Sequence, residues 1–156
     1  MKYLYFYDTK IGKIGIAEED GYIIKIYFEN GKIIKEDYEI FESEVIKEAS
    51  SQLNQYLNGK RKEFNLPFKL IGTEFRKNVW NSLKNIPYGH TSSYKEVAIS
   101  INNSKACRAV GMANNTNPIP IIIPCHRVIG SNNKLVGYAG GLEVKEFLLN
   151  LEKENL

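Results

Sequence analysis

Cysteine and histidine are scarce in this sequence, with two residues of each among 156. Two cysteines cannot build a disulfide scaffold, so any thiol is expected to be free. Long apolar runs are also lacking, because the densest stretch, residues 119–124, is interrupted by Pro120 and falls short of the roughly 18 residues that span a bilayer. Residues 1–8 lack the apolar segment and cleavage site of a secretory leader. We therefore expect a cytoplasmic protein with reduced thiols and no membrane segment.

The few side chains that could ligate a soft metal are scattered along the chain. They are His90, Cys107, Cys125 and His126, and residues 1–72 contain neither cysteine nor histidine. No Cys-x-x-Cys motif is present, and two ligands adjacent in sequence are a poor start for a tetrahedral zinc site. We expect no metal and no cofactor, and we interpret Cys107 as structural because it lies within a predicted helix.

Charge is distributed unevenly over a chain whose formal net charge is +3. Residues 1–72 carry 11 basic and 12 acidic side chains, whereas residues 73–156 carry 10 basic and 6 acidic ones. A polyanion would therefore prefer the second half. An excess of this size is also common on a solvated surface, so it supports a binding function only if a binding motif lies in the same half.

The first half of the chain is predicted to form an antiparallel sheet followed by a helix. Residues 3–8, 13–17 and 22–28 are rich in aromatic and β-branched residues and are separated by glycine-containing turns. The dipeptide Asn30-Gly31 predicts a further hairpin turn. A helix is expected to begin after Ser43 and to end at Gly59, with one apolar face formed by Val45, Ala49, Leu53 and Leu57. The basic run at residues 60–62 is interpreted as a solvated connection.

The second half of the chain is predicted to be mainly helical. Thr73 is expected to cap a first helix, and the capping box of Ser93 and Glu96 starts a second one that runs to about Ile101. Ser104 is a ready cap for the next helix. The closing helix is predicted to turn four apolar residues inward, namely Val144, Phe147, Leu148 and Leu151.

The two short helices after Ser93 form a candidate helix-turn-helix in the basic half. The second of them carries small residues, Ala109 and Gly111, around one long cation, Arg108. Readers of the major groove usually present Asn, Gln and Arg side chains, whereas small residues allow close approach to the narrower minor groove. A lone arginine on such a face could enter the base stack. The alternative interpretation is a tightly packed buried helix with Arg108 at its rim.

A candidate nucleophile follows the apolar run at residues 121–123, which predicts a buried strand. The thiolate form of Cys125 is the reactive one, so a nearby base or cation such as His126 or Arg127 is needed near neutral pH. Adjacent residues of an extended chain point in opposite directions, so His126 is expected to act through a water. The alternative is that Cys125 is an inert core thiol. Two candidates for orienting the imidazole lie in the closing helix, Glu146 and Glu152.

Several motifs together resemble the O6-alkylguanine-DNA alkyltransferases, also called methylated-DNA–protein-cysteine methyltransferases. The most specific is Pro-Cys-His-Arg-Val-Ile-Gly at residues 124–130, which resembles the active-site motif of this family. Further matches follow the family's order, at residues 72–76, 79–80, 86–89, 91–94, 106–111, 117–120, 138–142 and 145–146. The resemblance is dense over residues 72–153, whereas over residues 1–71 it rests on length and on the order of strands and helix.

The resemblance implies an α/β (α+β) fold with two domains. Residues 1–71 are expected to form a ribonuclease-H-like domain, a small antiparallel sheet with a helix. Residues 72–156 are expected to form a winged helix-turn-helix domain that carries DNA binding and alkyl transfer. The resemblance also implies a monomer whose partner is double-stranded DNA containing O6-alkylguanine.

The activity implied by the resemblance is DNA repair by direct reversal. An alkyl group, typically methyl, would pass irreversibly from O6 of guanine to Cys125, with O4 of thymine as an alternative donor, and each molecule would act once. Base flipping is required because the O6 substituent cannot reach a protein thiol from inside the duplex. His126 and Glu152 match a water-linked relay that activates the thiol. Tyr94 matches a tyrosine that crowds the phosphate and helps to protonate the leaving guanine.

The resemblance also assigns residues to DNA and to the base. Arg108 matches an arginine inserted into the duplex, and Asn117 matches an asparagine that ties the recognition region to the active-site turn. Backbone carbonyls near Cys125 and Val128 would accept from the guanine amine. The implied DNA-binding residues are Thr91, Ser93, Tyr94, Arg108, Ala109 and Gly111. The implied pocket for the substrate base consists of Asn117, Pro120, Val128, Tyr138, Ala139 and Lys145.

Some features depart from those found in parts of the family. Position 139 is Ala where some members have Ser, so a hydroxyl contribution to O6 is lost and a backbone N–H would have to serve. Some members hold zinc in the N-terminal domain with Cys and His ligands, which residues 1–72 lack. Non-reactive relatives carry Trp where this chain has Cys125. Two other functions stay open at this point, a non-catalytic module that senses lesions and a cysteine hydrolase for small acyl substrates.

Overall fold

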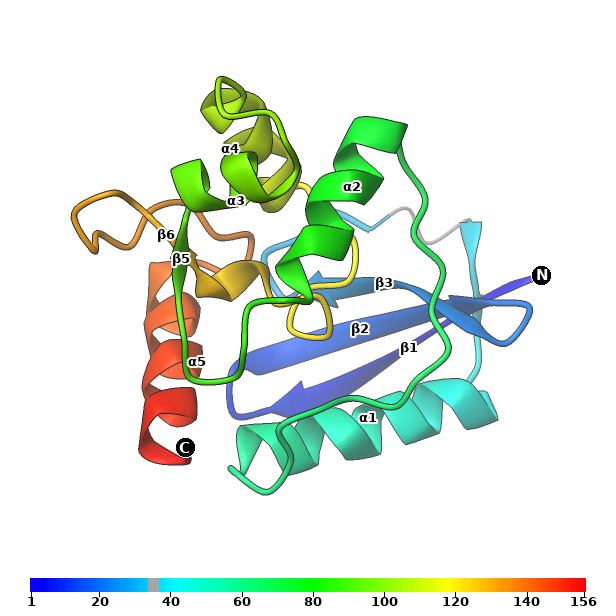
Figure 1. Ribbon diagram of the computed structural model, residues 1–156. Coiled ribbons are helices and arrows are strands. Elements are labelled where there is room, and N and C mark those ends of the chain that lie inside the picture. Colours follow the sequence, from blue (N-terminus) through cyan, green and yellow to red (C-terminus); the bar gives the residue numbers. More distant parts are fainter. Residues whose placement is uncertain (34–36) are drawn as a thin grey trace. The chain divides into compact units, whose positions relative to one another are not determined.

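A computed structural model describes residues 1–33 and 37–156 (Figure 1). The chain divides into two compact units, Met1–Leu70 and Ile71–Leu156. Among the described residues, no helix combines the length and the apolar character needed to cross a membrane.

The first unit contains the predicted antiparallel sheet. Its strands are β1 (Lys2–Thr9), β2 (Gly12–Glu19), β3 (Tyr22–Phe28) and β4 (Glu39–Ile40), in the order β3-β2-β1-β4. The first three pair antiparallel through tight turns, and the turn at Asp20 and Gly21 uses positive φ at both residues. The three strands predicted from the aromatic and β-branched runs are therefore confirmed.

The hairpin predicted at Asn30-Gly31 is wrong. The Gly31 amide donates to the Phe28 carbonyl at 2.9 Å, so a turn does form at this point. However, the next strand in the described part of the chain, β4, pairs with β1, and it does so in parallel. Turn residues fix the local reversal of the chain, but they do not determine which strand the following segment joins.

The helix α1 (Glu44–Leu57) packs on the sheet of the first unit (Figure 1). Ser43 caps it as predicted, because its side chain accepts from the Ile46 amide, and Gly59 follows the helix with a φ of 73°. Val45 is only partly buried, so the apolar face lies one position away from the predicted spacing at that end. The apolar residues that α1 buries are Ile46, Ala49, Leu53, Tyr56 and Leu57.

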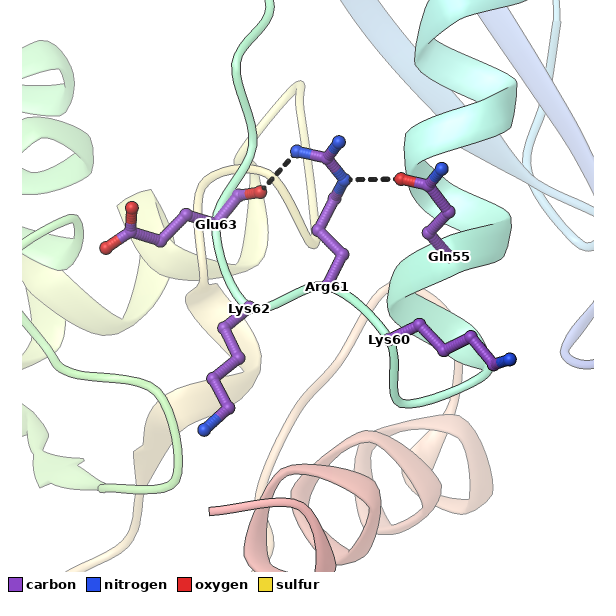
Figure 2. Close-up of a pocket in the computed structure, with 5 residues that line it drawn as sticks. All are labelled: Gln55, Lys60, Arg61, Lys62 and Glu63. Atoms are coloured by element: carbon purple, nitrogen blue, oxygen red, sulfur yellow. Dashed lines mark hydrogen bonds between the residues drawn. The ribbon is translucent and has the colours of Figure 1, made fainter.

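In the basic run after α1, Lys60 and Lys62 are exposed and Arg61 is partly exposed, which agrees with the interpretation of a solvated connection. Arg61 is held by its own neighbours, since Nε donates to Oε1 of Gln55 at 2.7 Å and Nη1 donates to the carbonyl of Glu63 at 2.9 Å (Figure 2). Lys60 and Lys62 extend away from Arg61 (Figure 2). These cations line an open hollow and do not converge on one point.

The second unit is built from helices and a short parallel pair of strands. The helices are α2 (Glu74–Leu83), α3 (Tyr94–Ser100), α4 (Cys107–Asn115) and α5 (Leu142–Glu154). The strands β5 (Ser92–Ser93) and β6 (Val128–Ile129) pair in parallel. Two predicted helix starts are confirmed, because Thr73 caps α2 and both hydrogen bonds of the capping box form between Ser93 and Glu96.

Packing fixes the rotation of α4. Val110 and Ala113 are buried, and Trp80 of α2 donates from Nε1 to the Ala113 carbonyl at 2.7 Å. Arg108 and Ala109 therefore lie on the exposed side of the helix. The alternative of a fully buried helix does not hold for this face.

Three expectations for the second unit are wrong. The helix α4 begins at Cys107 after Ala106, with no side-chain cap, so Ser104 does not cap it. Residues 121–123 form a tight turn bracketed by a bridge between Pro120 and Ile123, and not a strand. A short buried apolar run has no periodicity that separates a strand from a buried turn.

The third error concerns the inward face of α5. Phe147 is 37% exposed, whereas Leu148 is buried as predicted. Two charged residues, Lys145 and Glu152, are also buried on this helix. Charged residues are rarely buried unless they are paired, so the buried face of α5 indicates specific polar partners.

Candidate active site

Cys125 lies at the start of a single 3-10 turn, Cys125–Arg127, and only 4% of the residue is exposed. Asn117 shapes the approach to this turn, because Nδ2 donates to the Ile123 carbonyl at 2.8 Å and Oδ1 accepts from the Ile119 amide at 3.0 Å. Between these two bonds Ile121 has a φ of 73°, which is rare and strained for a β-branched residue. The backbone before the thiol is therefore held in a strained conformation by one buried amide.

The surroundings of the thiol have opposing effects on its pKa. Burial raises the pKa of Cys125 to about 11, while a hydrogen bond from Asn117 and the charge of Lys145 act to lower it. The thiol is therefore protonated at neutral pH in the free protein. A reaction at this sulfur requires that the proton be removed as the nucleophile is used.

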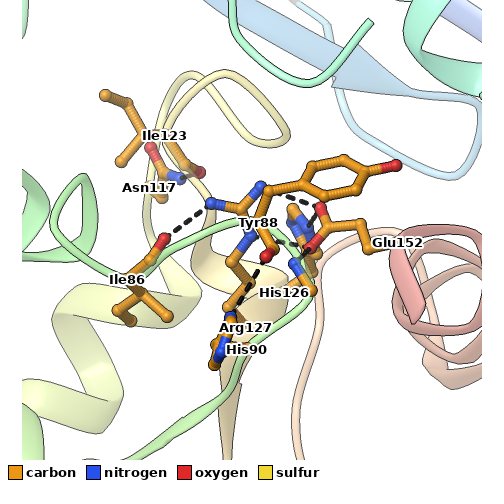
Figure 3. Close-up of polar contacts among 9 residues, drawn as sticks. Ile86, Tyr88, His90, Asn117, Ile123, His126, Arg127 and Glu152 are labelled. Carbon is orange, nitrogen blue, oxygen red and sulfur yellow. Dashed lines mark hydrogen bonds and ion pairs between the residues drawn. The ribbon is translucent and has the colours of Figure 1, made fainter. Parts of the chain in front are cut away.

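The Glu152 carboxylate binds three groups of the second unit, two of which, on His126 and Arg127, are drawn in Figure 3. Its Oε2 lies 2.7 Å from Nε2 of His126, and the Arg127 guanidinium donates to both oxygens, Nε to Oε1 at 2.8 Å and Nη2 to Oε2 at 2.9 Å. The Gly89 amide also donates to Oε1 at 3.1 Å. Burial alone would raise the pKa of Glu152, but the hydrogen bonds and charges of His126 and Arg127 hold it well below its usual range.

His126 is fully buried, and burial lowers its pKa although the contact with Glu152 favours the charged form. We therefore treat the imidazole as neutral and Arg127 as the lasting counter-charge of the Glu152 carboxylate. An ionised carboxylate can only accept, so Nε2 carries the imidazole proton and Nδ1 is the basic nitrogen. Arg127 is fixed further by a bond from Nη1 to the Ile86 carbonyl at 2.7 Å (Figure 3).

Lys145 is a second buried charge in the site. Its Nζ donates to the carbonyls of Val128 at 2.6 Å, Val136 at 2.8 Å and Gly137 at 3.4 Å. Burial lowers its pKa to about 8, and the nearby Cys125 acts in the opposite direction. Lys145 thus connects the segment after the thiol to the loop before α5, and it keeps a positive charge near the sulfur at neutral pH.

Tyr94 is the first residue of α3, and its hydroxyl donates to the Val136 carbonyl at 3.4 Å. Its ring faces Gly111 of α4, where a Cβ would lie only 3.8 Å from the ring. Burial and the proximity of Cys125 raise the Tyr94 pKa, while a hydrogen bond with Asn114 lowers it. This phenol therefore belongs to the surroundings of the thiol.

The other residues singled out from the sequence differ in how far they are exposed. Arg108, Ala109 and Thr91 are exposed, and Ser93 is the cap of α3. Pro120 and Val128 are buried near the active-site turn, whereas Ala139 is exposed and Tyr138 is half-buried in the loop before α5. Of the two glutamates considered as partners for the imidazole, the structure brings Glu152 to His126 and leaves Glu146 exposed.

Two contributors to the site were missed or misassigned by sequence reasoning. Arg127 was considered as a cation for the thiol, but its guanidinium binds Glu152. Asn114 was not considered, although it is buried and donates from Nδ2 to the Cys125 carbonyl at 3.3 Å. Its position four residues after the buried Val110 was the signal available, because that spacing places a polar residue on the inner face of α4.

The site combines a protonated buried thiol, a neutral imidazole oriented by a carboxylate, a buried ammonium and a phenol. Such a set can remove a proton from sulfur and deliver one to a leaving group. Within residues 1–33 and 37–156, no group of three His, Cys, Asp or Glu side chains is placed to hold a metal ion. A separate hollow of about 240 Å³ beside α3 is lined by other residues.

Comparisons of the sequence with known proteins agree over both units. A family model described as the DNA binding domain of 6-O-methylguanine DNA methyltransferase matches residues 74–154, and one described as its ribonuclease-like domain matches residues 2–70. The methylated-DNA–protein-cysteine methyltransferase of Methanosarcina acetivorans is 50% identical over 152 residues, which cover 96% of this chain and 97% of that protein. The constitutive Bacillus subtilis protein of the same name is 42% identical over 159 residues, with coverages of 98% and 96%.

Solved structures give the same result. A crystal structure of the O6-methylguanine methyltransferase of Mycobacterium tuberculosis matches with a TM-score of 0.93 at 39% identity, covering 100% of this chain and 95% of that one. A crystal structure of Mycobacterium tuberculosis OGT in complex with DNA matches with a TM-score of 0.89 at 39% identity, covering 98% and 94%.

Proposed function

Because this chain belongs to the 6-O-methylguanine DNA methyltransferase family, we propose that Cys125 is the residue that receives the alkyl group. The fold class predicted from the sequence is confirmed, with a ribonuclease-like domain followed by a DNA-binding domain. The function is DNA repair by direct reversal, in which the alkyl group on O6 of guanine in DNA passes to a cysteine of the protein itself. The observation that carries the assignment of the cysteine is the position of Cys125 beside His126, Lys145 and Tyr94.

The transfer is a displacement at the alkyl carbon. A bond forms between Sγ of Cys125 and that carbon as the bond from the carbon to O6 breaks, and the electron pair of the broken bond enters the guanine ring. The proton lost by the thiol is balanced by one gained by the purine, so no oxidant, reductant or cofactor is consumed. A thioether is a stable product, so each molecule acts once.

The proton of the thiol leaves through His126. Its Nδ1 is the basic nitrogen because Nε2 is bonded to Glu152. The contact from sulfur to imidazole runs through a water, as expected for adjacent residues. Lys145 supplies a positive charge that favours the thiolate, and the Arg127–Glu152 pair keeps the imidazole in one orientation.

DNA binds to the second unit through the exposed side of α4. Small residues at 109 and 111 let this helix approach the minor groove, and Arg108 enters the stack in place of the guanine that is turned out. Flipping costs a few kcal/mol, which the inserted arginine partly offsets. The remaining backbone contacts are assigned to Thr91, Ser93 and Tyr94.

The everted guanine occupies a pocket next to Cys125. We assign its walls to the active-site turn and to the loop before α5, that is, to Asn117, Pro120, Val128, Tyr138, Ala139 and Lys145. The domain division that accompanies this assignment is residues 1–71 and residues 72–156. We also propose that the protein acts as a monomer in the cytoplasm, where a single-use thiol stays reduced.

Mass spectrometry of the repaired protein tests the assignment. The protein is incubated with a duplex that holds one O6-methylguanine, and the peptides containing Cys125 and Cys107 are analysed. We expect one added methylene on Cys125, none on Cys107, and one repaired base per molecule. Cys125→Ser should abolish transfer, and Cys107→Ser should leave it intact. Repair by Cys125→Ser would overturn the assignment.

The number of reactions per protein molecule distinguishes alkyl transfer from the two other functions that the sequence left open. A cysteine hydrolase would turn over many times, whereas transfer to the protein stops near one event per molecule. A module that only senses lesions would leave the base alkylated. Duplex containing O4-methylthymine, added in the same assay, measures whether that base also serves as a donor.

A further inference from the structure

Asn114 carries a buried acceptor without a partner beside the reactive cysteine. Only 2% of the residue is exposed, and its Nδ2 donates to the Cys125 carbonyl at 3.3 Å. Its Oδ1 has no hydrogen-bond partner among the described residues. The other buried amide of the site, Asn117, uses both its Nδ2 and its Oδ1 in bonds to the backbone. An unpaired buried acceptor is costly, so the oxygen of Asn114 indicates a donor that arrives with a ligand.

The bond to Cys125 fixes which end of the Asn114 amide is free. A backbone carbonyl only accepts, so the NH₂ group faces the Cys125 carbonyl and the unpaired atom is the oxygen. Both atoms belong to one planar amide, so Oδ1 lies beside the backbone of the reactive residue. Cys125 is buried to a similar degree, so a base that reaches the sulfur enters the same part of the site.

The backbone acceptors next to the thiol are largely engaged. The Cys125 carbonyl accepts from the Val128 amide as well as from Asn114, so both of its lone pairs are used. The Val128 carbonyl accepts from Nζ of Lys145 at 2.6 Å, which leaves it one lone pair. The family resemblance implied that carbonyls near Cys125 and Val128 accept from the guanine amine. In this structure the Val128 carbonyl has room for one N–H, and Oδ1 of Asn114 can accept the other.

O6-alkylguanine offers a single donor group to such an oxygen. Alkylation at O6 leaves N1 without a hydrogen, N3 and N7 only accept, and N9 is bonded to the sugar. The amine at C2 therefore carries the only N–H groups of the base, and it lies on the Watson–Crick edge together with O6. An acceptor beside the thiol that attacks at O6 is thus on the correct edge of the base.

We propose that Asn114 is a specificity-determining residue whose Oδ1 accepts a hydrogen bond from the 2-amino group of the everted O6-alkylguanine. The inference rests on the proposed function and deepens it. O4-alkylthymine has no N–H group, because N1 is bonded to the sugar and N3 has lost its hydrogen. That base leaves Oδ1 unpaired, and a site with an unpaired polar group discriminates against the substrate that causes it. Asn114 therefore favours guanine lesions over thymine lesions.

Removal of the amine from the substrate tests the role of Asn114. O6-methylhypoxanthine is O6-methylguanine without the 2-amino group, and each base is placed in the same duplex. Single-turnover rates of methyl transfer are measured with protein in excess. We expect the natural protein to react at least about tenfold faster with O6-methylguanine. In Asn114→Leu this advantage should shrink by about tenfold, because leucine has a similar volume but no acceptor and covers the lone pair that Nδ2 leaves. Differences in base pairing affect both proteins alike and cancel in this comparison.

A second variant separates the acceptor from the rest of the side chain. Asn114→Asp keeps an oxygen that accepts, whether the carboxyl group is ionised or not, so the advantage of O6-methylguanine should persist. Asn78→Leu, at an exposed asparagine of α2, is the matched control and should preserve the ratio of the natural protein. With duplex that contains O4-methylthymine, Asn114→Leu should lower the preference for O6-methylguanine by about tenfold as well.

The outcomes separate this inference from the proposed function. Equal rates of the natural protein with O6-methylguanine and O6-methylhypoxanthine would overturn the inference without any variant. An unchanged ratio in Asn114→Leu would also overturn it, since a purely structural role slows both bases equally. A ratio in Asn114→Asp that falls as far as in Asn114→Leu would show that the acceptor is not what matters. In each case methylation of Cys125 still supports the proposed function, which fails only if Cys125→Ser repairs the base.

Discussion

The Arg127 guanidinium binds both carboxylate oxygens of Glu152, at 2.8 and 2.9 Å, and the pair is buried. One residue lies two positions after the thiol and the other lies in the last helix. The pair therefore anchors α5 to the active-site turn, and the same carboxylate orients the imidazole of His126. The ion pair serves the fold and the reaction together.

Breaking this pair should destabilise the protein strongly. Arg127→Met removes the cation and leaves a buried carboxylate without its counter-charge, a change that typically costs about 3–5 kcal/mol. We expect this decrease in the free energy of unfolding, measured by urea denaturation. Arg76→Met on α2 is the control, with an expected effect below about 0.5 kcal/mol. Equal midpoints for the two variants would contradict the structural role of the pair.

Stability should fall as the pH drops, in two stages. His126 has a lowered pKa in the folded protein, so below its unfolded value of about 6.5 the unfolded state binds a proton that the folded state does not. Glu152 also has a lowered pKa, so its contribution is complete above about pH 4.3 and is lost at lower pH. Melting temperatures between pH 8 and pH 3 measure both stages. Glu152→Gln should lack the lower stage, and a profile of the same shape in that variant would disprove the assignment.

The two cysteines should differ in reactivity toward small electrophiles. Cys125 is buried and burial raises its pKa to about 11, whereas Cys107 is partly exposed. In the DNA-free protein we expect iodoacetamide to label Cys107 first. The rate at Cys125 should keep rising with pH and show no plateau near pH 8.5, the usual pKa of a thiol. Peptide mass spectrometry over a pH series separates the two sites, and faster labelling of Cys125 at pH 7 would contradict this picture.

Removing the charge of Lys145 should make the thiol less acidic. Lys145→Met deletes a cation that lowers the Cys125 pKa, so the rate of iodoacetamide labelling at pH 7 should fall by about tenfold, or one pKa unit. The difference should shrink above pH 8, because Lys145 itself has a pKa of about 8 and loses its proton there. Lys153→Met, at an exposed position of α5, serves as the control. A difference that stays constant up to pH 10 would exclude an effect of charge.

Arg108→Ala should impair repair of duplex DNA specifically. The arginine is assigned to fill the space left by the flipped base, so its loss should slow transfer from paired O6-methylguanine by about tenfold or more, since flipping costs a few kcal/mol. The same lesion in a single strand needs no flipping and should react at nearly the parental rate. Lys77→Ala on α2 is the control for loss of a positive charge. Parental rates on the duplex would show that Arg108 has another role.

Local sequence signals predicted the parts of the fold that depend on neighbouring residues. Ser43, Thr73 and Ser93 cap the helices they were expected to cap, because a cap is a bond between residues three positions apart. The aromatic and β-branched runs predicted β1 to β3 because this signal, too, comes from residues that are neighbours in sequence. The turn at Ile121 was misread as strand because its backbone is set by Asn117, whose two bonds cannot be read from an apolar run.

The site was harder to predict because its buried polar residues bond to groups that are far away in the sequence. The apolar spacing of α5 suggested Phe147 as an inward residue, but Lys145 and Glu152 are buried because distant carbonyls and Arg127 satisfy them. Asn114 escaped notice for the same reason, since its partner lies on the active-site turn. Residue chemistry had already singled out the thiol and its imidazole as candidates, but the role of Tyr94 and the choice of Cys125 as the alkyl acceptor came from motif resemblance, which carries information on contacts that residue spacing lacks.

The sulfur of Cys125 belongs to a residue that is only 4% exposed in the protein without DNA, and this shielding has a consequence for the cell. A protein that is used up after one reaction wastes a whole molecule each time glutathione disulfide, a peroxide or a stray alkylating agent reaches its sulfur. Such compounds encounter a sulfur that is both covered and uncharged. Burial and protonation therefore slow the loss of active molecules to background chemistry, so that more of them stay available for lesions.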